Sequence, residues 1–330
     1  MSAGDDIAVR LVAPEEASLL VGLIQRCYGE TYIAPSFNSE AAVDELLRSG
    51  QLHSIGAFTE RGELVGHMGI ALRPHGGITA DAGMTLVDPA FRGRGIARRV
   101  AVSLAQQAMA LGMVGVHDYP VTVHAATQRI GAGFGVDTGL MLANMPADVV
   151  FQEMQTPSPG ARTSSLIRWL PFGLAPERTV YLPKRYRAQI EALYADALLS
   201  RSVVESDEGL IQGESELERV YDERRQTLRI AVTRPGSDLA DEVGAETRDA
   251  ATHGGLVAHV DLSLADSATP AASRALRAQG FFFAGLLPEY RDGDVLRMQW
   301  LADTVDDTAA SILSTDSTRA IEAFVLKDRV

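Results

Sequence analysis

Residues 87–97, with the sequence VDPAFRGRGIA, constrain the fold of this chain more than any other segment. An apolar run ends before Pro89, and from Ile96 to Leu111 apolar residues recur every three or four positions until Gly112. This pattern predicts a strand, a glycine-rich loop and a helix that ends at Gly112. The first amides of such a helix lack intrahelical acceptors and lie at the positive end of its dipole, and glycines let an anion approach closely. We therefore expect a pyrophosphate site here; the alternative is a tight turn with solvated arginines.

Two other phosphate-binding motifs fit this loop less well. A Walker A loop requires Gly-Lys followed by Ser or Thr, and the loop has no lysine. The dinucleotide fingerprint requires a third glycine where Arg98 stands. The loop therefore favours another kind of pyrophosphate ligand.

The first half of the chain predicts a mixed sheet. Two apolar runs separated by Glu-Arg-Gly-Glu at 60–63 are typical of a β-hairpin. Antiparallel strands that lead into a strand–loop–helix–strand unit indicate an α/β fold. The predicted strands cover 7–12, 54–59, 64–72, 79–87, 114–123 with an interruption at Pro120, 138–143 and 164–170. The predicted helices cover 15–28, 38–48, 96–111 and a short stretch from 125.

The second half shows a similar order of elements. The same two dipeptides, Gly-Phe and then Gly-Leu, follow a predicted short helix in each half. They are Gly133-Phe134 and Gly139-Leu140 in the first half, and Gly280-Phe281 and Gly285-Leu286 in the second. We therefore expect two copies of one fold, 1–175 and 176–330, each a mixed, mostly antiparallel sheet flanked by helices. The second copy is predicted to contain strands at 179–182, within 217–232 and at 256–262, 281–286 and 295–301, with helices at 184–198, 238–252 and up to 279, before a loop over 303–317 and a C-terminal helix.

Composition restricts the class of protein. The net charge of −13 repels nucleic acid and anionic membranes, and the sequence has no apolar run long enough to span a bilayer. Cys27 is the only cysteine, which excludes an internal disulfide and a cysteine-rich metal site. The acidic start of the chain lacks the basic region of a signal peptide, so we expect a cytoplasmic protein.

The loop resembles the motif of the GNAT superfamily of acyl-CoA N-acyltransferases, Arg/Gln-x-x-Gly-x-Gly/Ala, which Arg92, Gly95 and Ala97 match. The order of elements over residues 7–143 also resembles this family. The resemblance implies that acetyl-CoA is the co-substrate and that Thr85, Leu86 and Val87 pair with its pantetheine arm through main-chain groups. It also implies that the backbone amides that follow Arg92 in the sequence hold the pyrophosphate; these belong to Gly93, Arg94, Gly95, Ile96 and Ala97.

Three residues are candidates for catalysis. Family members often have a general base on the strand before the loop, and Asp81 stands at that position; it could instead be an exposed carboxylate at a strand edge. The family's tyrosine on the short helix is missing, and Thr127 could donate a hydrogen bond to the CoA sulfur or satisfy a nearby carbonyl. His124 could act as a base or be structural. The spacing of His117, Asp118 and His124 does not match a metal site, so we expect none.

The family's acceptor pocket is shaped by the segment that here contains Tyr28, Tyr32 and Phe37, and none of these side chains identifies an acceptor. The second half lacks the loop motif: the helix predicted at 238–252 begins with Asp238, Asp241 and Glu242, which would repel a pyrophosphate. We therefore interpret it as a degenerate GNAT-like domain that supports the first, covers its cleft or mediates association, including homo-oligomer formation.

The leading hypothesis from the sequence is an acetyl-CoA-dependent N-acetyltransferase that acts on a small amine or a protein amino group. The missing tyrosine and the degenerate second half leave a non-catalytic acyl-CoA sensor or interaction module as the alternative. A binder of nucleotide phosphates unrelated to CoA is a third hypothesis.

Overall fold

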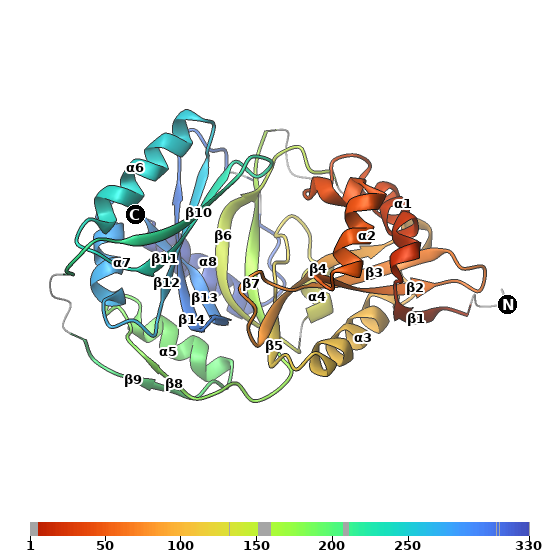
Figure 1. Cartoon of the computed structure of the whole chain (residues 1–330), viewed down its shortest axis with the longest axis horizontal. Helices are drawn as coiled ribbons and strands as arrows, with labels where there is room; N and C mark the ends of the chain where they lie inside the picture. Colours follow the sequence, from red (N-terminus) through yellow and green to blue (C-terminus); the bar gives the residue numbers. More distant parts are fainter. Residues whose placement is uncertain are drawn as a thin grey trace.

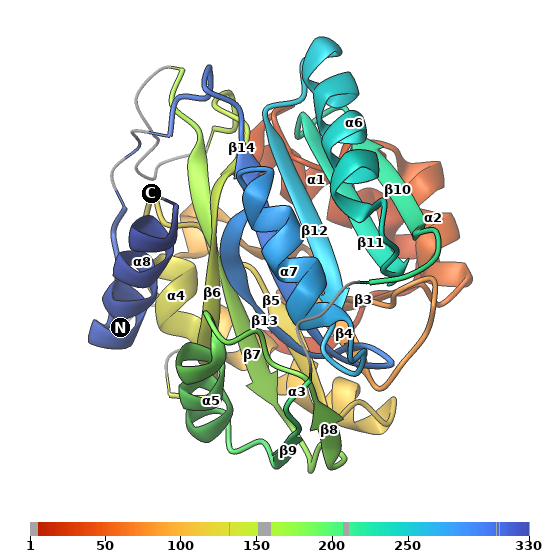
Figure 2. The same ribbon diagram turned by 90° about the vertical axis from the view of Figure 1, so that its left-hand side faces the viewer.

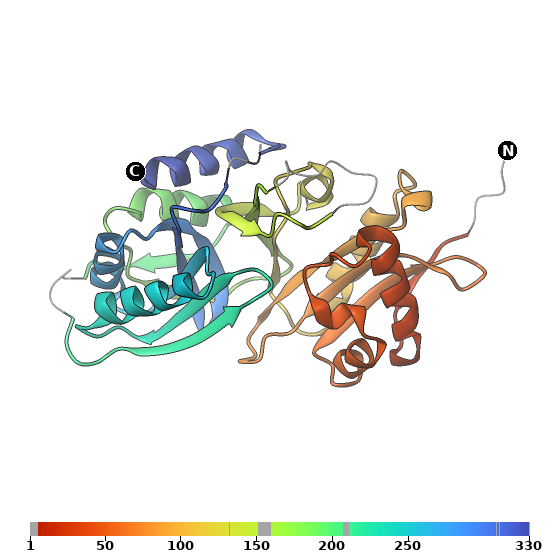
Figure 3. The same cartoon turned by 90° about the horizontal axis from the view of Figure 1, so that it is seen from above.

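The computed structural model describes residues 6–131, 133–150, 160–206, 211–307, 309 and 311–329. One 12-stranded sheet runs through the molecule in the order β1-β2-β3-β4-β5-β7-β6-β13-β14-β12-β11-β10. The two halves of the chain lie side by side in Figure 1, with β6 and β7 between them. Figure 3 shows the same division from above, red to yellow on one side and cyan to blue on the other.

The first half is a mostly antiparallel sheet covered by helices on both faces. Apolar residues of α1 and α2 pack on one face, including Leu20 and Val43, and those of α3, including Ile96 and Val100, pack on the other. Its strands are β1 (Ala8–Leu11), β2 (Leu52–Phe58), β3 (Leu64–Ala71), β4 (Thr79–Val87), β5 (Gly115–Asp118), β6 (Val136–Met145) and β7 (Thr163–Pro171). Its helices are α1 (Ala17–Tyr28), α2 (Glu40–Arg48), α3 (Ile96–Ala110) and α4 (Ala126–Gly131).

The helices of the second half pack their apolar residues into one core with its strands, and Figure 2 shows α6 and α7 in front of the sheet. The C-terminal helix α8 contacts both β6 and β13 and so lies across the junction of the halves. The strands are β8 (Arg178–Val180), β9 (Arg201–Val203), β10 (Glu216–Asp222), β11 (Thr227–Arg234), β12 (Val257–Ser263), β13 (Phe282–Arg291) and β14 (Gly293–Leu301). The helices are α5 (Arg187–Asp196), α6 (Leu239–Thr252), α7 (Thr269–Ala278) and α8 (Asp316–Asp328).

The order of elements repeats between the halves. In each, an antiparallel pair is followed by a helix and a parallel strand: β3-β4-α3-β5 and β10-β11-α6-β12. In each, the last strand then inserts between the two before it, so that β7 lies between β5 and β6, and β14 between β12 and β13. The fold class predicted from the sequence, a mixed and mostly antiparallel sheet flanked by helices, is confirmed.

Two local features differ from the predictions. The strand predicted over 114–123 with an interruption at Pro120 ends at Asp118, because Pro120 lacks the N–H that a continued ladder requires, and only an isolated bridge at Val121 follows. The short strand β9 was not predicted, and it pairs in parallel with β8 in a separate two-stranded sheet. Within the described residues, no helix is both long and apolar enough to cross a membrane.

Candidate functional site

The parallel strands β4 and β5 separate in the middle of the first half. They pair only from Thr79–Gly115 to Asp81–His117, whereas β4 continues to Val87. The later residues of β4, including Thr85 and Val87, therefore offer main-chain groups at an open strand edge. This opening in the sheet positions the site.

A β-bulge at Met84 lies just beyond the point where β4 separates from β5. Met84 has a φ of 54°, and the register of β3 with β4 shifts at this point. The imidazole of His67 fixes the bulge: Nδ1 lies 3.0 Å from the Met84 carbonyl oxygen and Nε2 lies 2.9 Å from Ser54 Oγ. Burial lowers the pKa of His67 to about 4, so this imidazole is neutral at pH 7 and Nδ1 carries the proton that the carbonyl accepts.

The glycine-rich loop follows β4 through a short 3-10 helix, Pro89–Phe91. Asp88 caps this turn by accepting from the Ala90 amide at 3.0 Å, and Arg26 of α1 holds its carboxylate at 2.5 Å. Gly95, with a φ of 73°, is the residue before the first turn of α3. A side chain is strained at that φ, which explains the glycine, and the first amides of α3 open onto the loop.

A pocket of about 290 Å³, which we call the loop pocket, lies between the β4 edge and the start of α3. Eight of the nine residues predicted to bind CoA line it: Thr85, Leu86, Val87, Arg92, Gly93, Gly95, Ile96 and Ala97. Arg94 does not. Its guanidinium is exposed and lies over the Phe91 ring, 4.7 Å from the centroid.

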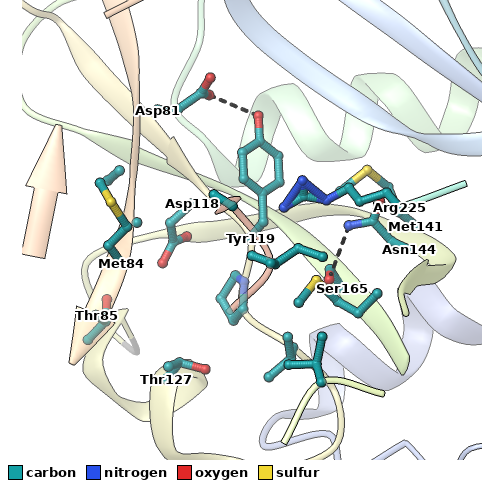
Figure 4. Close-up of a pocket in the computed structure, with 18 of the residues that line it drawn as sticks. Asp81, Met84, Thr85, Asp118, Tyr119, Thr127, Met141, Asn144, Ser165 and Arg225 are labelled. Carbon is teal, nitrogen blue, oxygen red and sulfur yellow. Dashed lines mark hydrogen bonds between the residues drawn. The ribbon is translucent and has the colours of Figure 1, made fainter. Parts of the chain in front are cut away.

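A second pocket of about 380 Å³, the central pocket, lies where the two halves of the chain meet. Figure 4 shows Asp118 on one side of Tyr119 and Arg225, from the second half, on the other. Tyr32 and Phe37 line this pocket together with apolar side chains, so the predicted acceptor segment does border it.

The two pockets share four lining residues: Tyr28, Thr85, His124 and Thr127. The hydroxyl of Thr127 makes no hydrogen bond: its buried Oγ1 has no hydrogen-bond partner in the described part of the chain. Thr127 therefore does not form the hydrogen bond to a nearby carbonyl that was the alternative to a catalytic role. Burial of His124 lowers its pKa, so its imidazole is neutral at pH 7.

Asp81 is not an isolated strand-edge carboxylate. It forms a two-point ion pair with Arg73, with an Nη2–Oδ1 distance of 2.7 Å, and accepts a hydrogen bond from Tyr119 at 3.0 Å. Its oxygens are therefore already engaged by the Arg73 guanidinium and the Tyr119 hydroxyl.

Asp118, at the end of β5, has the properties that Asp81 lacks. Its Oδ1 is buried and has no hydrogen-bond partner among the described residues. Burial raises the pKa of Asp118 to about 7, which the Arg168 guanidinium counteracts only in part. Figure 4 places its carboxylate on the side of the pocket where Met84, Thr85 and Thr127 lie. In the sequence, Asp118 was considered only as a metal ligand. Its position directly before Tyr119-Pro120, where a strand must end, could have indicated a carboxylate at the opening of the sheet.

The equivalent turn of the second half is filled by its own chain. Before α6, the Gly236 amide donates to Ser215 Oγ at 2.9 Å and the Ser237 amide donates to the Gly213 carbonyl at 2.9 Å. A Cβ on Gly236 would lie 2.3 Å from the Ser215 nitrogen. The backbone at 213–215 therefore occupies the space that the loop pocket leaves open in the first half.

Comparisons with solved structures found remote similarity over about half of the chain. An N-acetyltransferase from Staphylococcus aureus is 14% identical, covers 51% of this chain and 99% of its own, and has a TM-score of 0.39. An acetyltransferase from Salmonella typhimurium, solved with acetyl-CoA, is 14% identical with 52% and 96% covered and a TM-score of 0.41. A GNAT family N-acetyltransferase from Escherichia coli, in complex with CoA, is 14% identical with 63% and 93% covered and a TM-score of 0.36.

No curated protein sequence matches the chain. The family model described as the acetyltransferase (GNAT) family matches residues 20–127. That range contains the open strand β4, the glycine-rich loop, α3 and the four residues at which the two pockets meet. On this match, residues 20–127 carry a GNAT acetyltransferase domain.

Proposed function

We propose that this chain is an acetyl-CoA-dependent N-acetyltransferase that binds acetyl-CoA in the loop pocket and an acceptor amine in the central pocket. The observation that carries the proposal is the contact between the pockets at Tyr28, Thr85, His124 and Thr127. A thioester lying along β4 would end at this contact, next to an amine entering from the other side. The family match over residues 20–127 supports the reaction type and acetyl-CoA as co-substrate.

Asp118 is the proposed general base. The neutral amine attacks the thioester carbonyl, the new C–N bond forms, and the C–S bond to CoA breaks. Asp118 takes the proton that the amine loses, and its pKa of about 7 suits this transfer at neutral pH. The free hydroxyl of Thr127 donates a hydrogen bond to the departing sulfur. Asp81 acts as a positioning residue, because it pairs with Arg73 and accepts a hydrogen bond from Tyr119, which lines the pocket.

The experiment follows the release of the CoA thiol in the presence of a panel of primary amines. Asp118→Asn is expected to lower kcat about 10²-fold with an unchanged affinity for acetyl-CoA, because general-base catalysis is typically worth 10²–10⁴-fold. Asp81→Asn serves as the matched control carboxylate and is expected to raise the KM of the amine more than it lowers kcat. Full turnover by Asp118→Asn would reject it as the base, and loss of turnover only in Asp81→Asn would return the role to Asp81.

We also propose that residues 1–175 and 176–330 are two GNAT-like units of which only the first binds acetyl-CoA. The repeated strand order and the filled turn before α6 support this division. The second unit then contributes to the acceptor site, because its strands form part of the wall of the central pocket.

A further inference from the structure

The central pocket is not a property of the first half alone. Five of its lining residues come from the second half: Arg225, Arg229, His259, Tyr290 and Arg297. Four of these are basic residue types, whereas the acidic residues of the lining, Asp81 and Asp118, both come from the first half. The two walls of the pocket therefore differ in charge.

This difference arises at equivalent positions of the repeated fold. In the first half, Asp81 on β4 pairs with His117 on β5, three residues into the parallel ladder. In the second half, Arg229 on β11 pairs with His259 on β12, also three residues into the parallel ladder. The repeat thus places a carboxylate on one wall and a guanidinium on the other.

The guanidinium groups on the second wall are only partly neutralised by protein carboxylates. Asp261 binds Arg297 through two hydrogen bonds of 2.7 and 2.8 Å. In contrast, Arg225 and Arg229 share the single carboxylate of Asp222, at 3.3 and 3.2 Å. Burial, with the Arg229 charge next to it, lowers the pKa of Arg225, as expected for a cation without sufficient negative charge around it.

His259 provides a second and independent observation on the same wall. Its side chain is 2% exposed and lines the pocket, and its Nε2 has no hydrogen-bond partner within the described residues. Buried polar atoms in native proteins are nearly always paired, so an unpaired one that borders a cavity indicates a ligand atom. A neutral imidazole can donate a hydrogen bond from Nε2 to an anion.

We propose that the acceptor is a small primary amine that also carries an anionic group, a carboxylate or a phosphate, which Arg225, Arg229 and His259 bind. The amine is oriented toward Asp118 and the contact between the pockets, while the anionic group lies against the second wall. The pocket volume of about 380 Å³ is within the range of small-molecule sites. This proposal rests on the acetyltransferase function and specifies its substrate class.

The test compares matched pairs of amines by the release of the CoA thiol. Amino acids are compared with their amides for the carboxylate, and phosphoethanolamine with ethanolamine for the phosphate. The anionic member of at least one pair is expected to have a kcat/KM about tenfold or more above its neutral partner, and the pair that shows it identifies the anion. A panel in which no anionic amine is acetylated faster than its neutral partner overturns the proposal.

Two substitutions show whether the second wall is responsible. Arg225→Gln is expected to raise the KM of the preferred anionic amine about tenfold and to leave kcat and the affinity for acetyl-CoA unchanged. Arg219→Gln is the control, since Arg219 lies on the adjacent strand β10 but pairs with Glu242 and Glu246 of α6, away from the pocket. An equal KM change for anionic and neutral amines in Arg225→Gln would contradict the proposal.

The failure of this inference differs from the failure of the proposed function. If the protein binds acetyl-CoA and acetylates neutral amines best, the function stands and the anionic acceptor is wrong. If the protein does not bind acetyl-CoA, the function itself is wrong.

Discussion

Gly139 of β6 pairs directly with Gly285 of β13, and this antiparallel pair joins the two halves of the sheet. A Cβ on Gly139 would lie 2.3 Å from the Ala284 carbonyl oxygen and 2.5 Å from the Gly285 Cα, both backbone atoms that cannot move independently of the strand. We therefore expect Gly139→Ala to separate the central strands and lower the free energy of unfolding by about 1–3 kcal/mol, the usual cost of overpacking. Thermal denaturation of the two proteins measures the effect.

Gly83→Ala is the control for this prediction. Gly83 is also a strand glycine, but a Cβ there would have no atom within 4 Å. Its melting temperature should stay close to that of the wild type. Equal melting temperatures for Gly139→Ala and the wild type would mean that the two halves do not depend on this close approach.

The loop pocket is tested by substitutions at the two ends of α3. Gly95 and Gly112 have φ values of 73° and 75°, and a Cβ at either would have no atom within 4 Å. Tryptophan at either position carries the same backbone strain, but only Gly95 lines the loop pocket. Gly95→Trp should abolish acetyl-CoA binding in calorimetry, whereas Gly112→Trp should bind normally. Retained binding by a folded Gly95→Trp protein would reject the assignment of the loop.

The pKa of Asp118 predicts the pH dependence of turnover. A base must be ionised to accept a proton, so kcat should rise with pH through a value of about 7 and level off above it. Asp118→Asn should lose this step. A wild-type profile that is flat between pH 5.5 and 8.5 would show that Asp118 does not limit the reaction.

The same group predicts how stability depends on pH. Its folded-state pKa of about 7 lies above the unfolded value of roughly 3.9, so the folded state retains a proton that the unfolded state loses. Asp118 therefore destabilises the protein progressively as pH rises from about 4 to 7. The melting temperature of Asp118→Asn relative to wild type should increase over this range. A constant difference between pH 4 and 8 would mean that the carboxylate is ionised throughout.

Cys27 is buried against the loop pocket, and burial raises the pKa of its thiol to about 11. Because the thiolate is the reactive form, the folded protein should not react with a thiol reagent at pH 8, while the unfolded protein should react with one equivalent. A spectrophotometric thiol titration checks this. Rapid reaction of the folded protein would contradict it and would also add a background to the CoA-thiol assay.

The sequence predicted most of what local patterns determine. The strand–loop–helix unit at Val87 to Ala97 followed from apolar periodicity and glycine placement, and the recurring Gly-Leu pairs at Gly139 and Gly285 indicated the repeat. The strands, the loop and the helix depend on neighbours within a few residues, so they can be predicted from a single sequence.

The missing parts depend on contacts between distant segments. The hydrogen bond from Tyr119 to Asp81 and the contact of Arg73 with the Tyr290 carbonyl arise only when β4, the end of β5 and β13 come together. The position of Arg225 in the central pocket depends on how the second half docks on the first. Sequence spacing contains no information on such contacts, so neither Asp118 as the proposed base nor the proposed acceptor wall could be predicted from the sequence.

Calorimetric titration of the purified chain with acetyl-CoA, with CoA, ATP and NAD as comparisons, measures whether the loop pocket binds acetyl-CoA. We expect one binding site for acetyl-CoA and CoA per chain, because the loop pocket of the first half is open whereas residues 213–215 fill the equivalent turn of the second half, and no comparable binding of ATP or NAD. The absence of binding by acetyl-CoA and CoA, or tighter binding of ATP or NAD, would contradict it.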